Sequence, residues 1–113
     1  MLILETPLPT ELYKLVSPEQ FADSQGADSL KLSEFDSDFI HFCEKDQIKK
    51  IADKFFAKFE SVSVLKIDPS KLSGRLVKES NPGGSTEYYH LYDGIIPMGS
   101  ILEFSETNLL TSK

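Results

Sequence analysis

The sequence contains two histidines, His41 and His90, and each lies inside an apolar, aromatic-rich segment where a polar ring is unusual. Imidazole can donate and accept hydrogen bonds and transfer protons near neutral pH. Burying such a ring without a partner costs about 1–3 kcal/mol, so each ring must have a hydrogen-bond partner or remain in contact with water. One shared cleft explains both exceptions, and we therefore expect the two imidazoles to open onto the same pocket. The alternative is that both histidines are structural, each with a backbone carbonyl as its partner.

Three more residues have side chains that could take part in such a site. Lys14 interrupts an apolar segment, and the alternation of side chains along a strand places it on the face opposite Tyr13, where it could bind a ligand phosphate. Glu79 lies just before a glycine-rich turn and could bind a ribose hydroxyl or act as a base. Tyr92 could stack on a base or a nicotinamide. Each residue also has an ordinary explanation: Lys14 could be a solvated surface lysine, Glu79 could form a surface ion pair, and Tyr92 could pack in the core.

Cys43 is the sole cysteine, which excludes an internal disulfide and a zinc site built on cysteines. No Asn or Asp that would orient a Cys–His pair is evident, so we expect Cys43 to be an unreactive packing residue. Two histidines without neighbouring carboxylates at ligand spacing are a poor metal site, and we expect no metal. The glycine-rich turn at residues 81–85 lacks the Lys-Ser/Thr pair of a P-loop and is typical of a hairpin.

Size and composition narrow the classes of function. At 113 residues the chain is the size of one domain, and its apolar fraction of 40% is typical of a globular protein. The net charge of −6 argues against general nucleic-acid binding, which needs clustered lysine and arginine. No apolar stretch approaches the roughly 18 residues of a membrane span, and the apolar N-terminus is too short for a signal sequence. These features predict a cytoplasmic protein that does not associate with membranes.

One strongly amphipathic helix is predicted over residues 45–59. Its apolar residues recur at helical spacing and are Ile48, Ile51, Ala52, Phe55, Phe56 and Phe59. Phe55 lies at the centre of this stripe, and we expect it to be deeply buried. A shorter helix is predicted to begin at Ser17-Pro18, because serine is a good N-cap and proline suits the first helical position.

The other apolar segments have the composition of strands. They cover residues 12–16, 39–43, 62–67, 76–79, 88–92 and 95–104. Because these strands are short and not separated by helices, the order indicates an α+β fold with a mostly antiparallel sheet. Residues 1–10 are predicted to be an N-terminal arm, residues 11–104 a single domain and residues 105–113 a C-terminal tail.

Several of these segments resemble the DUF952 family. The matching segments are DFIH (residues 38–41), a helix entered through Gln47, LKID (65–68), Glu79 before a Gly-Gly turn, YHLY (89–92) and the first-strand pair Tyr13-Lys14. They occur in the family's order and cover residues 11–104. The resemblance implies a fold similar to the ADP-ribosyltransferase core, which is a split, mostly antiparallel sheet with one main helix. In true transferases the cleft of that fold holds NAD.

The sequence also departs from the family pattern around the cleft. Where the family has Gly, Ser, Trp, Pro and Gly, this chain has Asp38, Cys43, Lys78, Tyr89 and Asp93. Glu44 replaces the capping threonine three residues before Gln47, which predicts a poorer capping box. The fold motifs are retained. The catalytic triad of the transferases, which is His or Arg, then Tyr or Ser, then Glu, is not matched closely, because only Lys14, Cys43 and Glu79 lie at roughly similar places.

Three classes of function follow. In the first, the protein is an ADP-ribosyltransferase-like enzyme that binds NAD or a related nucleotide, with a protein acceptor that the sequence does not identify. The resemblance then implies catalytic roles for Glu79, His41 and His90, and cofactor contacts from Lys14, His41, His90 and Tyr92. In the second, the same cleft belongs to a non-catalytic small-molecule binding module. In the third, the chain is a protein-interaction domain with structural histidines and no open cleft beside them.

Overall fold

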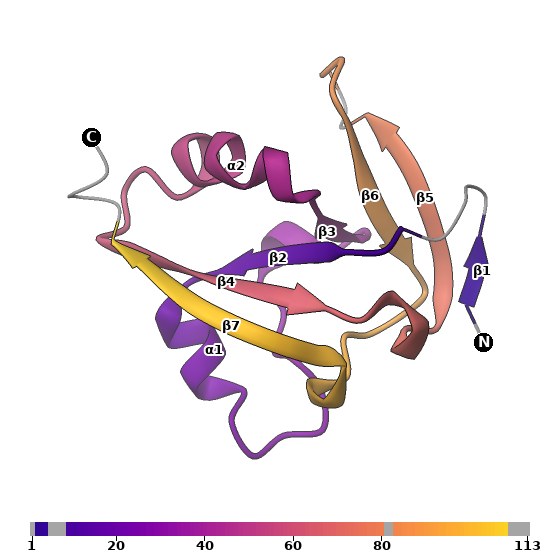
Figure 1. The fold of residues 1–113 in the computed structure, drawn as a ribbon, viewed down its shortest axis with the longest axis horizontal. Coiled ribbons are helices and arrows are strands. Elements are labelled where there is room, and N and C mark those ends of the chain that lie inside the picture. The colour runs from indigo at the N-terminus through magenta and orange to yellow at the C-terminus, as the bar shows by residue number, and fades with distance from the viewer. Residues whose placement is uncertain (1, 5–8, 81–82, 109–113) are drawn as a thin grey trace.

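A computed structural model describes residues 2–4, 9–80 and 83–108 (Figure 1). Two sheets form the fold. The first contains, in spatial order, β1 (Leu2–Leu4), β5 (Gly74–Ser80), β6 (Glu87–Tyr92) and β3 (Ile40–Phe42), and the second contains β2 (Leu12–Val16), β4 (Ser61–Ile67) and β7 (Ile101–Asn108). All pairs of neighbouring strands are antiparallel except β1 and β5, which are parallel. The predicted α+β class with mostly antiparallel sheets and one main helix is therefore confirmed.

Side chains on β2 alternate between two apolar clusters. Leu12 and Val16 belong to the core between the two sheets, whereas Tyr13 and Leu15 belong to a second cluster with the main helix, α2 (Ile48–Phe55). Lys14 lies on the same face of β2 as Leu12 and Val16, as the alternation predicted. That face is turned toward the interior, and the Lys14 side chain is buried. At the end of β2, Ser17 caps the short helix α1 (Pro18–Asp23), and its Oγ accepts the Gln20 N–H at 3.0 Å.

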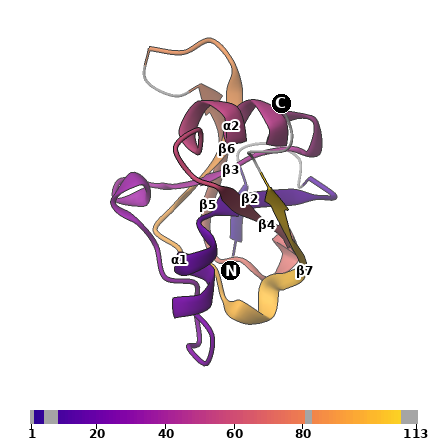
Figure 2. The same cartoon turned by 90° about the vertical axis from the view of Figure 1, so that its left-hand side faces the viewer.

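The two helices lie on opposite sides of β2, as Figures 1 and 2 show. The helical segment starts at Lys45, as the sequence predicts, but its first turn, η2 (Lys45–Gln47), is a 3₁₀ turn that leads into α2. The prediction of a poorer capping box is wrong, because Glu44 and Gln47 form a complete one. The helix ends earlier than predicted, at Phe55, because the backbone of Phe56 leaves the helical conformation and the Phe59 N–H closes a short turn onto the Phe56 carbonyl at 3.0 Å.

The prediction that Phe55 is deeply buried is wrong. Its side chain is half-buried, whereas Ala52 of the same helix is buried. Phe55 lines a cavity on one side of the helix, which is described below. A periodic apolar stripe predicts which face of a helix turns inward, but it cannot distinguish the wall of a packed core from the wall of a cavity.

A pair of backbone hydrogen bonds joins the two sheets. Cys43, which follows β3, exchanges two backbone hydrogen bonds with Tyr13 of β2, each 2.9 Å long. β3 also pairs with β6 along its other edge, so this short strand connects the sheets. Residues from both sheets consequently meet around Cys43.

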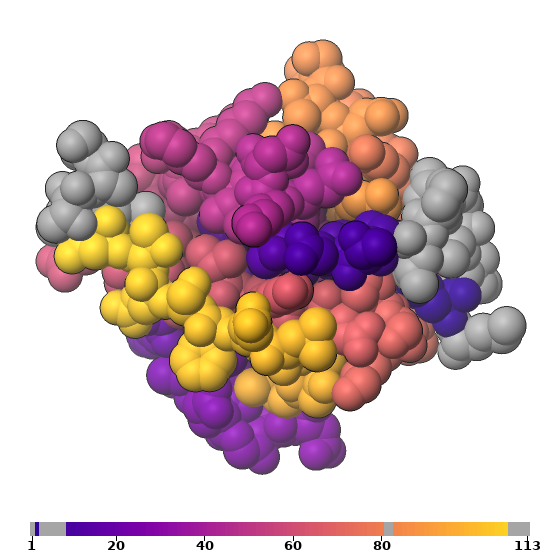
Figure 3. Space-filling view, viewed as in Figure 1, coloured from indigo at the N-terminus to yellow at the C-terminus, as the bar shows by residue number. Residues whose placement is uncertain are grey.

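The ends of the chain add two strands at the edges of the sheets. Leu2–Leu4 of the predicted N-terminal arm forms β1 against β5, and residues 5–8 lie outside the described residues. β7 begins after a 3₁₀ turn, η4 (Met98–Ser100), and continues to Asn108, so the first four residues of the predicted tail are part of a strand. Residues 109–113 lie outside the described range. Figure 3 shows β7 along the surface, where its residues from Leu102 onward are exposed.

Candidate functional site

His41 and His90 are direct partners across the antiparallel pair β3–β6. Opposite residues of such a pair project to the same face of the sheet, and the two ring centroids are 5.3 Å apart with an edge-to-face angle of 70°. The structure therefore brings together the two imidazoles that the sequence placed in separate segments.

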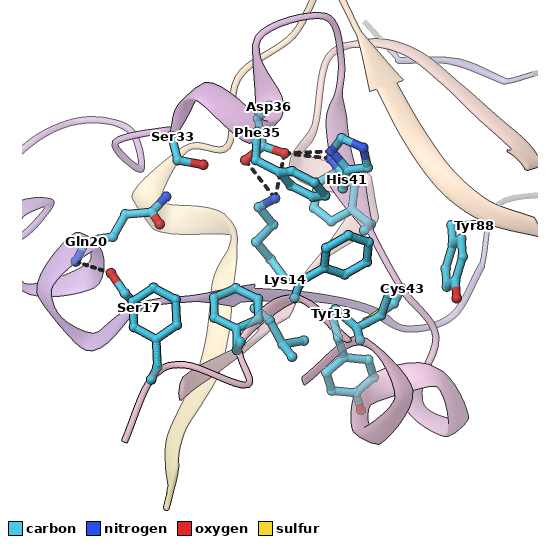
Figure 4. Close-up of a pocket in the computed structure, with 16 residues that line it drawn as sticks. Tyr13, Lys14, Ser17, Gln20, Ser33, Phe35, Asp36, His41, Cys43 and Tyr88 are labelled. Carbon is cyan, nitrogen blue, oxygen red and sulfur yellow. Dashed lines mark hydrogen bonds and ion pairs between the residues drawn. The ribbon is translucent and has the colours of Figure 1, made fainter. Parts of the chain in front are cut away.

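A buried carboxylate positions His41. Asp36 is the last residue of a 3₁₀ turn, η1 (Glu34–Asp36), and its Oδ1 accepts the His41 backbone N–H at 3.0 Å and lies 3.0 Å from His41 Nδ1. Because a carboxylate accepts hydrogen bonds, this contact places the proton of the neutral ring on Nδ1. The other nitrogen, Nε2, points away from Asp36 (Figure 4).

The same carboxylate binds Lys14. Lys14 Nζ donates to both oxygens of Asp36 at 2.8 Å, and the two side chains are 4% and 2% exposed. Burial lowers the pKa of Lys14, and the negative charge of Asp36 opposes that shift. Burial raises the pKa of Asp36, but the hydrogen bond with His41 and the contacts with Lys14 outweigh it, so the pKa of Asp36 lies below its ordinary value. Asp36 is thus an anion paired with a cation, and the pair has no net charge.

A second carboxylate binds the other histidine. His90 Nδ1 lies 2.8 Å from Glu79 Oε2, and the same oxygen accepts a hydrogen bond from the Tyr92 hydroxyl. The His90 ring is fully buried and stacks on Phe39 at a centroid distance of 4.1 Å. Burial lowers the pKa of His90, Glu79 opposes this shift, and the charge of His41 adds to it. The pKa of Glu79 is lowered by its hydrogen bonds with Tyr92 and His90.

A cavity of about 320 Å³ lies beside the Lys14–Asp36–His41 group (Figure 4). Most of its wall is apolar and comes from β2, β3, η1, the helix α2 and the turn that follows this helix. The lining residues are Tyr13, Leu15, Phe35, Phe42, Cys43, Ile51, Phe55, Phe56, Phe59 and Tyr88, together with the polar residues Lys14, Ser17, Gln20, Ser33, Asp36 and His41. The ring of Phe35 stacks on that of His41 with a centroid distance of 4.3 Å, and its centroid lies 4.9 Å from that of Phe55. Phe35 thus connects the polar group with the apolar wall.

The predicted site residues divide into two groups. Lys14 and His41 line this cavity, whereas Glu79, His90 and Tyr92 do not. Of the two imidazoles, this cavity therefore takes only that of His41, and the shared cleft with Glu79 stays a prediction. The Phe39 ring lies against both imidazoles, with centroid distances of 4.7 Å to His41 and 4.1 Å to His90.

Two residues of the site were not predicted. Asp36 holds both Lys14 and His41, and Phe35 covers the His41 ring. Both lie in the polar segment SEFDSD (residues 33–38), where Glu34 and Asp38 are exposed. Nothing in that composition distinguishes the buried acid from its exposed neighbours.

Cys43 also lines the cavity but has the character of a packing residue. Its side chain is buried, and burial raises the pKa of the thiol to about 12, although Lys14 opposes the shift. The group is a neutral thiol at physiological pH, as expected of an unreactive cysteine. Among the described residues, no three His, Cys, Asp or Glu side chains come together as a metal site, and none of the described helices could cross a membrane.

Comparison with known proteins identifies the family. No curated protein sequence matches the chain. Two crystal structures of protein CC0527 from Caulobacter crescentus are similar: the first is 22% identical, the second, a double mutant of that protein, is 21% identical, and each has a TM-score of 0.71. The alignment covers 86% of this chain and 85% of that protein, which supports the fold. Residues 15–104 match the family described as "Protein of unknown function (DUF952)". The chain therefore belongs to the DUF952 family.

Proposed function

We propose that the protein binds a small molecule in the cavity beside Lys14, Asp36 and His41. The observation that carries this proposal is the combination of an apolar, aromatic wall with one buried polar group at a single place on it. Sites for small molecules are concave, mostly apolar and supplied with a few polar groups that orient the ligand, and their volumes are roughly 300–1,000 Å³. The cavity, at about 320 Å³, has the size for one ring system with its substituents.

The hydrogen bonds of Lys14 add support. An ammonium group has three N–H donors, and in the part of the chain that the structure describes, the hydrogen bonds of Lys14 go to the two oxygens of Asp36. The third donor belongs to a side chain that is almost fully buried and lines the cavity. Leaving such a donor unsatisfied costs about 1–3 kcal/mol. An oxygen atom of a ligand in the cavity would remove that cost.

An ADP-ribosyltransferase-like enzyme that uses NAD is the second candidate. It is favoured by two histidine–carboxylate pairs whose histidines lie on adjacent strands, since paired imidazoles and carboxylates are the usual groups of acid–base chemistry. In that proposal Glu79, His41 and His90 act on the nucleotide. The charge of the cavity favours the first candidate, because a diphosphate requires uncompensated positive charge and Lys14 is already paired with Asp36.

Thermal denaturation and ligand-observed NMR with a panel of single-ring aromatic compounds, NAD and ADP-ribose would test the proposal. A compound at a hundredfold excess over its Kd should stabilise the protein by about 2.7 kcal/mol. We expect members of the aromatic group to bind, and NAD and ADP-ribose to bind more weakly or not at all.

Two phenylalanine variants locate the binding site. Phe59 is 44% exposed and lines the cavity, whereas Phe104 is 65% exposed and lies on β7 away from it. Phe59→Ala should weaken binding, and Phe104→Ala should leave it unchanged. Binding that is insensitive to Phe59→Ala, or stabilisation by NAD alone, would overturn the proposal.

A further inference from the structure

The charges around the cavity cancel, and its carboxylate is held mainly by hydrogen-bond donors of the protein itself. Among the described residues that line it, Lys14 and Asp36 are the charged ones. Asp36 Oδ1 contacts Lys14 Nζ, the His41 backbone N–H and His41 Nδ1, and Oδ2 contacts Lys14 Nζ, which gives four contacts in all. An ionised carboxylate has about four acceptor positions. Three of these contacts fall on Oδ1, which therefore has no position left for a donor on a ligand, and Oδ2 already accepts from Lys14 in a carboxylate that is 2% exposed. Lys14 still has a donor to offer.

This arrangement discriminates between ligand charges. A cationic group would be repelled by the ammonium of Lys14, which already contacts both oxygens of Asp36 at 2.8 Å. An anionic group would lose its hydration in an apolar cavity, and the attraction of Lys14 would be offset by the repulsion of Asp36, whose oxygens are 2.8 Å from that ammonium. A neutral oxygen acceptor has neither difficulty.

The wall indicates what the rest of the ligand is. Five phenylalanines line the cavity, and their positions are Phe35, Phe42, Phe55, Phe56 and Phe59. Phe35, which contacts both His41 and Phe55, is half-exposed, so part of its ring surface is available for contact. Aromatic side chains pack favourably against a flat ring in offset or edge-to-face geometry.

We infer that the ligand is an uncharged aromatic compound with a carbonyl-type oxygen, which accepts a hydrogen bond from Lys14 while the ring packs among the phenylalanines. This inference rests on the proposed function and specifies its ligand class. The ion pair with Asp36 is then a device that fixes the ammonium in place and cancels its charge, so that it recognises a dipole and not an anion.

Four probes of similar shape separate the possibilities: acetophenone, benzoate, benzylammonium and ethylbenzene. Their Kd values would be measured at pH 7 by titration of the ¹⁵N-labelled protein. We expect acetophenone to bind at least tenfold more tightly than benzoate or benzylammonium, and more tightly than ethylbenzene. If benzoate binds most tightly, the inferred ligand class is overturned and the proposed function stands. If none of the four binds, the proposed function fails with it.

Variants then test the role of Lys14. Because Lys14→Met alone leaves Asp36 without its cation, the double variant Lys14→Met/Asp36→Leu removes both charges together and adds no hydrogen-bond donor to the cavity. Ethylbenzene, which has no oxygen to accept from Lys14, is the reference ligand. The preference of the double variant for acetophenone over ethylbenzene should disappear, and retention of that preference would overturn the role of Lys14.

Discussion

His41 and His90 face each other across two paired strands with their ring centroids 5.3 Å apart, yet each Nδ1 contacts a different carboxylate. Each ring is thereby held by its own acid. The two positions differ in solvent contact, because the His41 side chain is partly exposed and the His90 side chain is sealed. His41 therefore contributes to the wall of the cavity, whereas buried His90 affects the stability of the fold.

The sealed histidine should make stability depend on pH. The pKa of His90 is lowered by burial, so the unfolded state binds a proton more readily than the folded state. The contribution of neutral His90 to the free energy of unfolding is fully present above the unfolded-state pKa of about 6.5, and it is lost as pH falls toward the folded-state pKa. We expect the free energy of unfolding, measured with urea, to decline between pH 7.5 and pH 5, with part of the decline absent in His90→Gln. An identical decline in that variant would show that another group is responsible.

At lower pH the carboxylates should add a second loss of stability. The pKa values of Asp36 and Glu79 are lowered in the folded state. Both carboxylates therefore contribute to the free energy of unfolding above their unfolded-state pKa values of about 4, and this contribution is lost as pH falls through the folded-state pKa values. Urea denaturation from pH 5 to pH 3 should show this decline, and Asp36→Asn should reduce its slope. An unchanged slope would mean that Asp36 has an ordinary pKa in the folded protein.

The buried ion pair gives a prediction about substitution. Lys14→Met leaves the carboxylate of Asp36 buried without its cation, and removing one partner of a buried pair costs about 3–5 kcal/mol. Lys14→Met/Asp36→Leu should recover much of that loss, because an apolar replacement of both partners is often neutral. Lys49→Met is the matched control, since Lys49 pairs with Asp53 on the surface, where such a pair contributes about 0.3–0.5 kcal/mol. Similar losses for Lys14 and Lys49 would contradict the burial of the pair.

Two phenylalanines test the boundary between core and cavity. Both residues line the cavity, but Phe42 is 2% exposed and belongs to the core between the sheets, so Phe42→Ala should cost about 3–5 kcal/mol. Phe55→Ala should cost clearly less, because its ring is only half-buried and belongs to neither core cluster. Denaturation midpoints of the two variants provide the comparison. An equal loss would place Phe55 in the core after all.

Cys43 should react slowly with thiol reagents. Burial raises its pKa to about 12, so almost no thiolate is present at pH 7, and the side chain is closed off from solvent. We expect labelling of the folded protein to be far slower than labelling in urea. Rapid labelling under native conditions would revive Cys43 as a nucleophile.

Local signals explain what could be predicted from the sequence. Ser17-Pro18 specifies the start of α1, and the spacing of Ile48, Ile51 and Ala52 specifies the inner face of α2, because both depend on neighbouring residues alone. The two histidines could be expected together because each is a polar exception within an apolar strand.

What could not be predicted depends on contacts between distant segments. The register that places His41 opposite His90 follows from the pairing of β3 with β6, which no local pattern reveals. The burial of Asp36 depends on Lys14, a residue 22 positions earlier, and neither side chain alone indicates the pair. The end of α2 at Phe55 is likewise set by the turn that follows the helix.

The two hydrogen bonds between Tyr13 and Cys43 would couple the proposed ligand binding to the association of the sheets. Lys14 follows Tyr13 on one sheet, and His41 precedes Cys43 by two residues on the other, so a ligand in the cavity touches both sheets on either side of this junction. Any opening of the junction separates the walls that the ligand needs. By thermodynamic linkage, a ligand must then slow hydrogen exchange of the Tyr13 and Cys43 amides in proportion to its occupancy, and the exchange rates of two backbone protons become a measure of binding in a protein without tryptophan.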